Sequence, residues 1–168
     1  MRSVSDFAAV PIAVIGGASA TPAIAELAAE VGREIALRGG VLLCGGRGGV
    51  MEHAARGARE AGGTTIGILP GNPGQERPNA YLEHSIFTGM GQARNQILVL
   101  SAVAVIAVGG GWGTLSEIAL ALKQRIPVVQ LGGHGVLPPS GERDPLLFAA
   151  NSPAEAVAAA FAAARSPS

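Results

Sequence analysis

Apolar residues along this chain gather in short continuous runs rather than alternating with polar residues. Such runs are typical of strands in a parallel sheet that is covered on both faces, because both sides of each strand are then buried. The runs predict six strands, over residues 11–15, 41–44, 65–69, 85–87, 103–108 and 127–131.

The segments between most of these runs carry helical signals. Thr21 is a capping residue followed by a proline at the first helical position, and apolar residues then recur at helical spacing as far as Ile35. Further helices are predicted over residues 50–61, 92–101, 114–124 and 152–164, the last opened by a capping box. Strands that alternate with helices predict a single-domain α/β protein, with a Rossmann-like, doubly wound parallel sheet of about six or seven strands. Residues 132–145 are predicted to form one long loop, and residues 1–9 a flexible amino terminus.

Charge and cysteine content narrow the class of protein. The 168 residues carry 12 basic and 12 acidic side chains, and this balance argues against a nucleic-acid partner, which usually requires a basic face. The longest apolar run, residues 102–108, is too short to span a bilayer, and the amino terminus lacks the apolar core of a signal peptide. The lone Cys44 allows no disulfide within the chain, and no two histidines have the spacing of metal ligands. We therefore expect a cytoplasmic protein with neither a membrane partner nor a metal site.

Glycine is the main clue to function, because almost every predicted strand ends in it. The strand-end glycines are Gly16, Gly17, Gly45, Gly46, Gly71, Gly89, Gly91, Gly109, Gly110, Gly111, Gly132 and Gly133. The carboxyl ends of parallel strands lie at one edge of the sheet, where ligands bind in open α/β folds. Glycine there permits positive φ angles and a close approach of the backbone to a ligand. The pattern predicts a ligand site at this edge.

Two of these glycine segments are copies of one pattern. Residues 45–52 and 110–117 both have the form G-G-x-G-x-apolar-x-E, after an apolar strand and before a helix. The free amides and the dipole at the start of such a helix attract an anion. Neither copy matches the phosphate loop of ATPases, and neither is a well-spaced dinucleotide fingerprint. A phosphate held by these loops is the simplest interpretation.

Charged side chains flank the second copy. Thr114 can bind a phosphate oxygen through its hydroxyl, and Glu117 lies on the same face of the helix. Arg94 is predicted in the first turn of its helix, where a cation opposes the helix dipole, so we expect it to meet a ligand phosphate or Glu117. Trp112 is placed in the loop, where it could stack on a base or contact a neighbouring subunit. Roles for Arg47, Glu52 and His134 stay open.

Residues 90–95 followed by 110–117 resemble the "Lonely Guy" family of cytokinin-activating nucleoside 5′-monophosphate phosphoribohydrolases. The family pattern is an arginine–lysine pair and then P-G-G-x-G-T-x-x-E, and residues 45–51 are similar to its earlier G-G-G-x-x-G-x-M segment. The resemblance covers residues 10–131. It implies that Arg94 and Glu117 are catalytic. It also implies a nucleotide site formed by Gly16, Gly17, Gly45, Gly46, Met90, Asn95, Gly110, Gly111, Trp112, Gly113 and Thr114, with Gly111, Gly113 and Thr114 on the phosphate.

Two departures from that pattern lead to a second interpretation. Asn95 replaces the usual lysine and Gly109 the usual proline, and both features are similar to a branch of molybdenum cofactor carrier proteins. The resemblance therefore implies either an enzyme that releases the base from AMP or a cytokinin nucleotide, or a carrier of a nucleotide or of molybdenum cofactor. It also implies a homodimer or larger homo-oligomer and no bound cofactor in the enzyme. A lysine decarboxylase, a label often given to this family, is disfavoured because Lys123 is the only lysine and its position suits a helix end.

Overall fold

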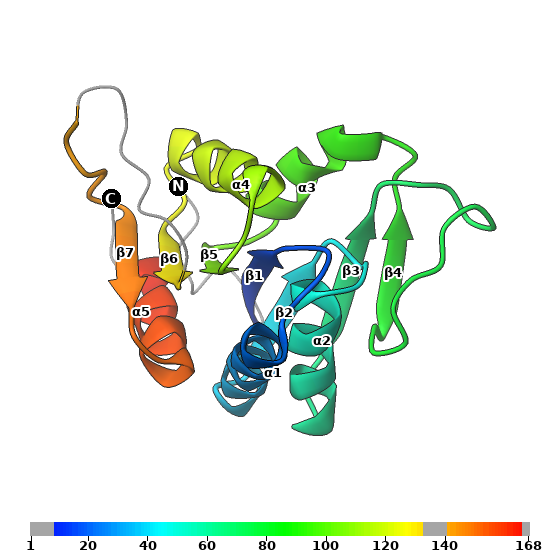
Figure 1. Cartoon of the computed structure of the whole chain (residues 1–168), viewed down its shortest axis with the longest axis horizontal. Coiled ribbons are helices and arrows are strands. Elements are labelled where there is room, and N and C mark those ends of the chain that lie inside the picture. The colour runs from blue at the N-terminus through cyan, green and yellow to red at the C-terminus, as the bar shows by residue number, and fades with distance from the viewer. Residues whose placement is uncertain (1–8, 133–140, 166–168) are drawn as a thin grey trace.

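The computed structural model describes residues 9–132 and 141–165, and its centre is one sheet of seven parallel strands (Figure 1). The strands are β1 (Val10–Gly16), β2 (Gly40–Cys44), β3 (Thr65–Leu69), β4 (His84–Phe87), β5 (Ala104–Val108), β6 (Val128–Leu131) and β7 (Leu147–Ala150). Their order across the sheet is β4-β3-β2-β1-β5-β6-β7, and each neighbouring pair is parallel. The predicted fold class is confirmed.

Helices cover both faces of the sheet (Figure 1). One face carries α1 (Pro22–Leu37), α2 (Val50–Glu60) and α5 (Pro153–Arg165), and the other carries α3 (Arg94–Leu100) and α4 (Trp112–Lys123). Each face of the sheet has its own hydrophobic core, and alternate residues of β1 contribute to one core or the other. Ile12 and Val14 pack on the α1 side, whereas Ala13 and Ile15 pack on the α3 side. Within the described ranges, no helix is both long enough and apolar enough to cross a bilayer.

The order of the strands creates a switch point beside β1. The chain runs outward from β1 through α1, β2 and α2 to β3 and on to β4, and it then returns through α3 to β5 on the other side of β1. The connections that leave β1 and β5 therefore diverge to opposite faces. Ligands of open α/β sheets bind at such a point, outside the carboxyl ends of the strands.

The structure departs from the sequence predictions at three places. β7 was not among the six predicted strands. It forms one edge of the sheet, beside β6, and follows a segment rich in glycine and proline. The predicted helix over 92–101 is a 3₁₀ turn, Gly91–Ala93, followed by α3 from Arg94. Trp112 is the first residue of α4, so its placement in the loop was wrong. The predicted flexible amino terminus, except residue 9, and the part of the predicted 132–145 loop at 133–140 lie outside the described residues.

Candidate functional site

The connection from β5 to α4 is a tight turn formed by two glycines. Residues 109–111 together with the first two residues of α4 form what we call the second glycine loop, in which Gly109 and Gly110 have φ angles of 56° and 121°. A Cβ atom on Gly110 would lie 2.5 Å from Oγ1 of Thr114, so only glycine fits between the loop and the buried threonine. This tight turn lets α4 begin at Trp112, directly above the end of β5.

The start of α4 has no side-chain cap. Gly111 occupies the cap position and makes no side-chain hydrogen bond to the helix, whereas α1 is capped by the Thr21 hydroxyl, which accepts a bond of 3.3 Å from the Ile24 amide. The first amides of an α-helix have no partner inside the helix, so those of α4 are left for solvent or a ligand. A Cβ atom on Gly111 or Gly113 would meet no heavy atom within 4 Å. The amides are therefore approachable from outside.

Arg94 and Glu117 form a buried pair beside this helix start. Their residues are only 6% and 8% exposed, and Nη1 of Arg94 lies 3.7 Å from Oε1 of Glu117. That separation is an ion pair and too long for a hydrogen bond. Nε and Nη1 of Arg94 have no hydrogen-bond partner among the residues that the structure describes. Because buried polar nitrogens are almost always paired, these two are suited to a bound ligand.

Burial changes the acid–base behaviour of both members of the pair. Loss of solvent raises the pKa of Glu117 to about 7, although the nearby Arg94 charge works in the opposite direction. Burial also lowers the pKa of Arg94, an effect that Glu117 partly offsets. A carboxyl group that titrates near neutrality can donate or accept a proton at physiological pH.

The second part of the site is the connection from β2 to α2. Residues 45–49 form the first glycine loop, and a Cβ atom on Gly45 would lie 2.6 Å from Nη2 of Arg94. The guanidinium of Arg94 therefore rests against bare backbone at the end of β2. The neighbouring Cys44 is buried, and this burial raises the pKa of its thiol to about 11, so it is a neutral core residue and not a nucleophile.

Several backbone groups in and next to the first glycine loop are held by contacts within the protein, although α2, like α4, starts without a side-chain cap. The Val50 amide, the first of α2, donates a hydrogen bond of 3.0 Å to the Gly17 carbonyl. Gly49 has a φ angle of 64°, and a Cβ there would lie 2.3 Å from the same carbonyl oxygen. Gly16 faces Val50 at similarly close range. The structure thus places Gly16 and Gly17 against the first loop, where they fix its shape.

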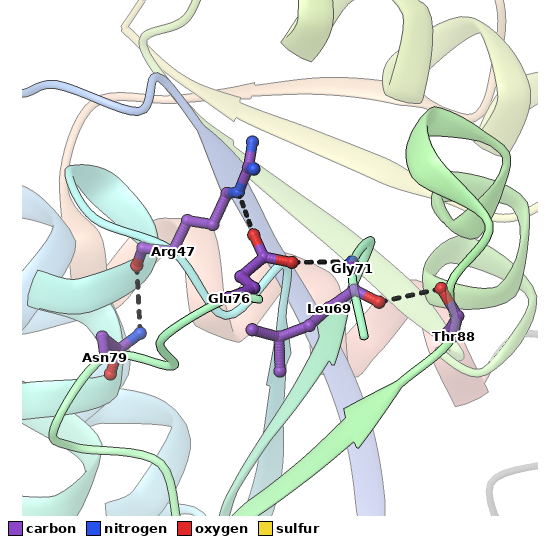
Figure 2. Close-up of polar contacts among 6 residues, drawn as sticks. All are labelled: Arg47, Leu69, Gly71, Glu76, Asn79 and Thr88. Carbon is purple, nitrogen blue, oxygen red and sulfur yellow. Dashed lines mark hydrogen bonds and ion pairs between the residues drawn. The ribbon is translucent and has the colours of Figure 1, made fainter. Parts of the chain in front are cut away.

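Sequence reasoning missed the segment that follows β3. Glu76 accepts hydrogen bonds from Nε of Arg47 and from the amide of Gly71, at 2.6 Å for the latter (Figure 2). Asn79 donates from its side chain to the Arg47 carbonyl and from its backbone to the Gly46 carbonyl, each at 3.0 Å. Residues 71–79 thereby tie down the first glycine loop. Arg47 and Glu76 lie 29 positions apart, and no sequence spacing links them.

The remaining predicted residues fall around this arrangement. Met90 is about half exposed just before the 3₁₀ turn, and Trp112 is 87% exposed. Asn95 is buried, and its Oδ1 has no hydrogen-bond partner within the described ranges. Glu52 is half-buried beside Gly48 and forms no counterpart of the Arg94 pair with any residue in the described part of the chain. His134 lies outside the described residues.

The chain's family follows from a comparison that covers most of its length. The model of the SLOG cluster4 family matches residues 9–159. The chain belongs to this family. The match confirms the family resemblance found in the glycine motifs, and it places those motifs in a SLOG protein.

Two kinds of functional name are found among the solved structures and curated proteins that this SLOG protein resembles. A molybdenum cofactor binding protein from the bacterium Rippkaea orientalis is 42% identical with a TM-score of 0.83, over 92% of this chain and 96% of that one. The molybdenum cofactor carrier protein of Chlamydomonas reinhardtii is 40% identical with a TM-score of 0.82, over 92% and 98%. A cytokinin riboside 5′-monophosphate phosphoribohydrolase of Mycobacterium tuberculosis is 39% identical over 110 residues, which are 64% of this chain and 59% of that protein.

Proposed function

We propose that this protein hydrolyses the N-glycosidic bond of a nucleoside 5′-monophosphate, such as AMP or a cytokinin nucleotide, and releases the base and ribose 5-phosphate. The observation that carries this proposal is the position of Glu117. Its carboxyl group is buried, is paired with Arg94, and titrates at a pKa of about 7 on the helix whose amino terminus is uncapped and open.

The open start of α4 supports binding of the phosphate. The amides of Gly113 and Thr114 lie in its first turn, where the helix dipole favours an anion. Glu117 lies one turn further along the same helix, and a residue three positions from Thr114 shares its face. A phosphate held by these amides would therefore carry its ribose next to the Glu117 carboxyl group.

The proposed reaction needs the groups that this site provides. Water adds to the anomeric carbon of the ribose while the bond to the base nitrogen breaks, and the base leaves with a proton. Positive charge grows on the sugar in the transition state, as it does in glycoside hydrolysis. The Glu117 carboxylate can stabilise this charge, hold the ribose hydroxyls or orient the water. The free nitrogens of Arg94 can bind the ligand while its Nη1 stays near Glu117.

A second candidate function is the binding of molybdenum cofactor without chemistry. Two solved structures that match over nine-tenths of this chain are proteins named for that ligand, and the buried Asn95 stands where the phosphoribohydrolase pattern has a lysine. The organic part of this ligand is a pterin with a phosphate ester. The same amides of α4 would hold that ester.

Incubation with mononucleotides separates the two candidates. We expect free base and ribose 5-phosphate in equal amounts when the protein is incubated with AMP, GMP or a cytokinin riboside monophosphate and the products are separated by chromatography. A protein that binds these nucleotides or a pterin phosphate and returns them intact would be a carrier. A protein that neither cleaves nor binds any of them would contradict both candidates.

A further inference from the structure

The carboxylate of Glu117 is free of hydrogen bonds as well as buried. Its side chain is 11% exposed, and no residue within 9–132 or 141–165 donates a hydrogen bond to either oxygen. Arg94, at 3.7 Å, forms an ion pair with it and leaves both oxygens available to a ligand. Poor solvation makes the carboxylate more basic, in line with its pKa of about 7. Free lone pairs and raised basicity both favour attack on an electrophilic carbon.

Glu117 also stands apart from the other carboxylates near the two glycine loops. Glu76 accepts hydrogen bonds from Nε of Arg47 and from the Gly71 amide, and Glu52 lies in the first turn of α2. No carboxylate in the described part of the chain acts on the pKa of Glu117. In one-step hydrolysis a carboxylate must hold a water between itself and the sugar, whereas in the two-step route it contacts the anomeric carbon directly. A lone, buried carboxylate with free oxygens suits direct contact.

We propose that Glu117 is a nucleophile that takes ribose 5-phosphate from one base and can pass it to another, so that the protein exchanges bases as well as releasing them. This inference rests on the proposed function, because it takes the ribose to lie against Glu117 while the phosphate is held at the start of α4. It adds a second acceptor, a free purine base, to the water of the hydrolysis.

The exchange is balanced without a further reactant. In the first step an oxygen of Glu117 forms a bond with C1′ of the ribose, and the bond from C1′ to N9 of the base breaks. Its electron pair goes to N9, and the base takes a proton from solvent. In the second step N9 of another base attacks C1′, the ester bond breaks, and its electron pair returns to the carboxylate. The proton of that N9 goes to solvent, and a nucleotide is formed again.

Water and a base compete for the ester intermediate at the same place. Glu117 occupies the face of C1′ opposite to the departing base, so any acceptor must approach through the space that the base has left. A base that rebinds there excludes water from C1′ and is itself aligned for attack. Hydrolysis and exchange are therefore two outcomes of one intermediate.

Isotope exchange tests the inference. When the full chain is incubated with AMP and radiolabelled adenine, we expect label to appear in AMP while unlabelled adenine and ribose 5-phosphate accumulate. The control contains radiolabelled adenine and ribose 5-phosphate but no AMP. No label should enter AMP there, because the large excess of water opposes formation of the ester from the free sugar. As much labelled AMP in this control as in the complete mixture would overturn the inference, since hydrolysis would simply be running in reverse.

Two matched variants assign the exchange to Glu117. Glu117→Gln lacks the nucleophile and should lose exchange and hydrolysis together, each by at least about 100-fold. Calorimetry with ribose 5-phosphate checks that this variant still folds and binds the sugar phosphate. Glu52→Gln makes the same change at the end of the first glycine motif and should exchange base at the wild-type rate.

The configuration at C1′ distinguishes two displacements from one. Free ribose 5-phosphate interconverts between its anomers, but methanol as the acceptor gives a methyl riboside 5-phosphate whose configuration is fixed. Two displacements restore the β configuration of the nucleotide, whereas one displacement inverts it. We expect the β-methyl riboside when AMP is cleaved in dilute methanol and the products are analysed by NMR spectroscopy.

Two results would overturn the inference and leave the proposed function standing. The first is base release from AMP with no label exchanged into the remaining AMP. The second is the α-methyl riboside, because the acceptor would then have attacked the nucleotide itself. A wild-type protein that neither releases nor exchanges a base would overturn the proposed function together with the inference, as would wild-type rates of both in Glu117→Gln.

Discussion

The two glycine loops share one sequence pattern but differ in what their backbones contact. In the first loop, Gly17 and Asn79 occupy the amide of Val50 and the carbonyls of Gly46 and Arg47. In the second loop, the space around Gly111 and Gly113 is empty. The same pattern therefore packs against neighbouring segments in one copy and lies open to solvent in the other. The shared motif specifies a glycine turn before a helix. The contacts made by neighbouring segments determine how much of its backbone stays accessible to a ligand.

The copies also differ in where the helix begins. α4 begins at Trp112, the third residue of its motif, whereas α2 begins at Val50, the sixth. Positive φ angles at Gly109 and Gly110 complete the second turn early, but those of the first loop fall at Gly46 and Gly49. The final glutamates consequently end in different surroundings. Glu117 is buried with Arg94, and Glu52 is half-buried with no such partner among residues 9–132 and 141–165.

The largest expected difference between the copies is catalytic. Glu117→Gln should lower the rate of base release by about 10²- to 10⁴-fold, because the amide can neither carry the negative charge nor exchange a proton. Binding of ribose 5-phosphate should persist. Glu52→Gln makes the same change at the equivalent position of the first loop and should leave the rate unaltered. Steady-state assays with GMP and AMP measure both, and full activity in Glu117→Gln would remove Glu117 from the mechanism.

Alanine substitutions should affect stability more in the first glycine loop than in the second. Gly49→Ala should lower the free energy of unfolding by at least about 2 kcal/mol, because its Cβ would strike the Gly17 carbonyl at a positive φ angle. Gly113→Ala has open space and should not destabilise the fold, but its methyl group should weaken phosphate binding. Urea denaturation and calorimetry with ribose 5-phosphate measure the two effects. Equal stability of the two variants would contradict the division into scaffold and site.

Much of this arrangement could be predicted from sequence because its signals are local. Continuous apolar runs such as residues 103–108 identify buried strands, and the glycines that follow them mark the carboxyl edge. The dipole argument at Arg94 predicts a ligand phosphate or Glu117 as its partner, and Arg94 is paired with Glu117 in the structure. These predictions succeed because each depends on a few neighbouring residues.

The missed features depend on contacts between distant residues. Nothing near Glu76 in the sequence indicates that it holds Arg47, because a connection of 29 residues brings them together. The start of α4 at Trp112 depends on φ angles at Gly109 and Gly110, and glycine permits either sign of φ. β7 was missed because a four-residue strand with two buried ends, Leu147 and Ala150, gives little apolar pattern.

The pH dependence of the hydrolysis rate should depend on Glu117 and not on Glu52. With a pKa of about 7, Glu117 is the carboxylate above neutrality and the acid below it. If the carboxylate is the active form, kcat/KM should fall about tenfold per pH unit well below pH 7. Arg94→Gln should move this limb to higher pH, because Arg94 lowers the pKa of Glu117. Glu52→Gln should leave the limb in place, and a limb near pH 4.5 in the wild type would contradict the assignment.

The smallest expected effect is on stability as a function of pH. In the folded state Glu117 keeps its proton up to about pH 7, whereas an exposed glutamate releases it near pH 4.5. The contribution of Glu117 to the free energy of unfolding is therefore fully present at low pH and is lost as the pH rises through 7. Between pH 6 and 8 the wild type should lose about 1 kcal/mol more than Glu117→Gln does. Parallel urea titrations measure this difference. Identical slopes would mean that Glu117 titrates as an ordinary surface carboxylate.

A crystal structure of the Glu117→Gln variant with bound GMP tests the central claim most directly, since a slow variant keeps the nucleotide whole. We predict that the phosphate accepts hydrogen bonds from the amides of Gly113 and Thr114 and that the ribose lies against residue 117. A phosphate seated on the first glycine loop, or a nucleotide away from the Arg94 side chain, would contradict the account.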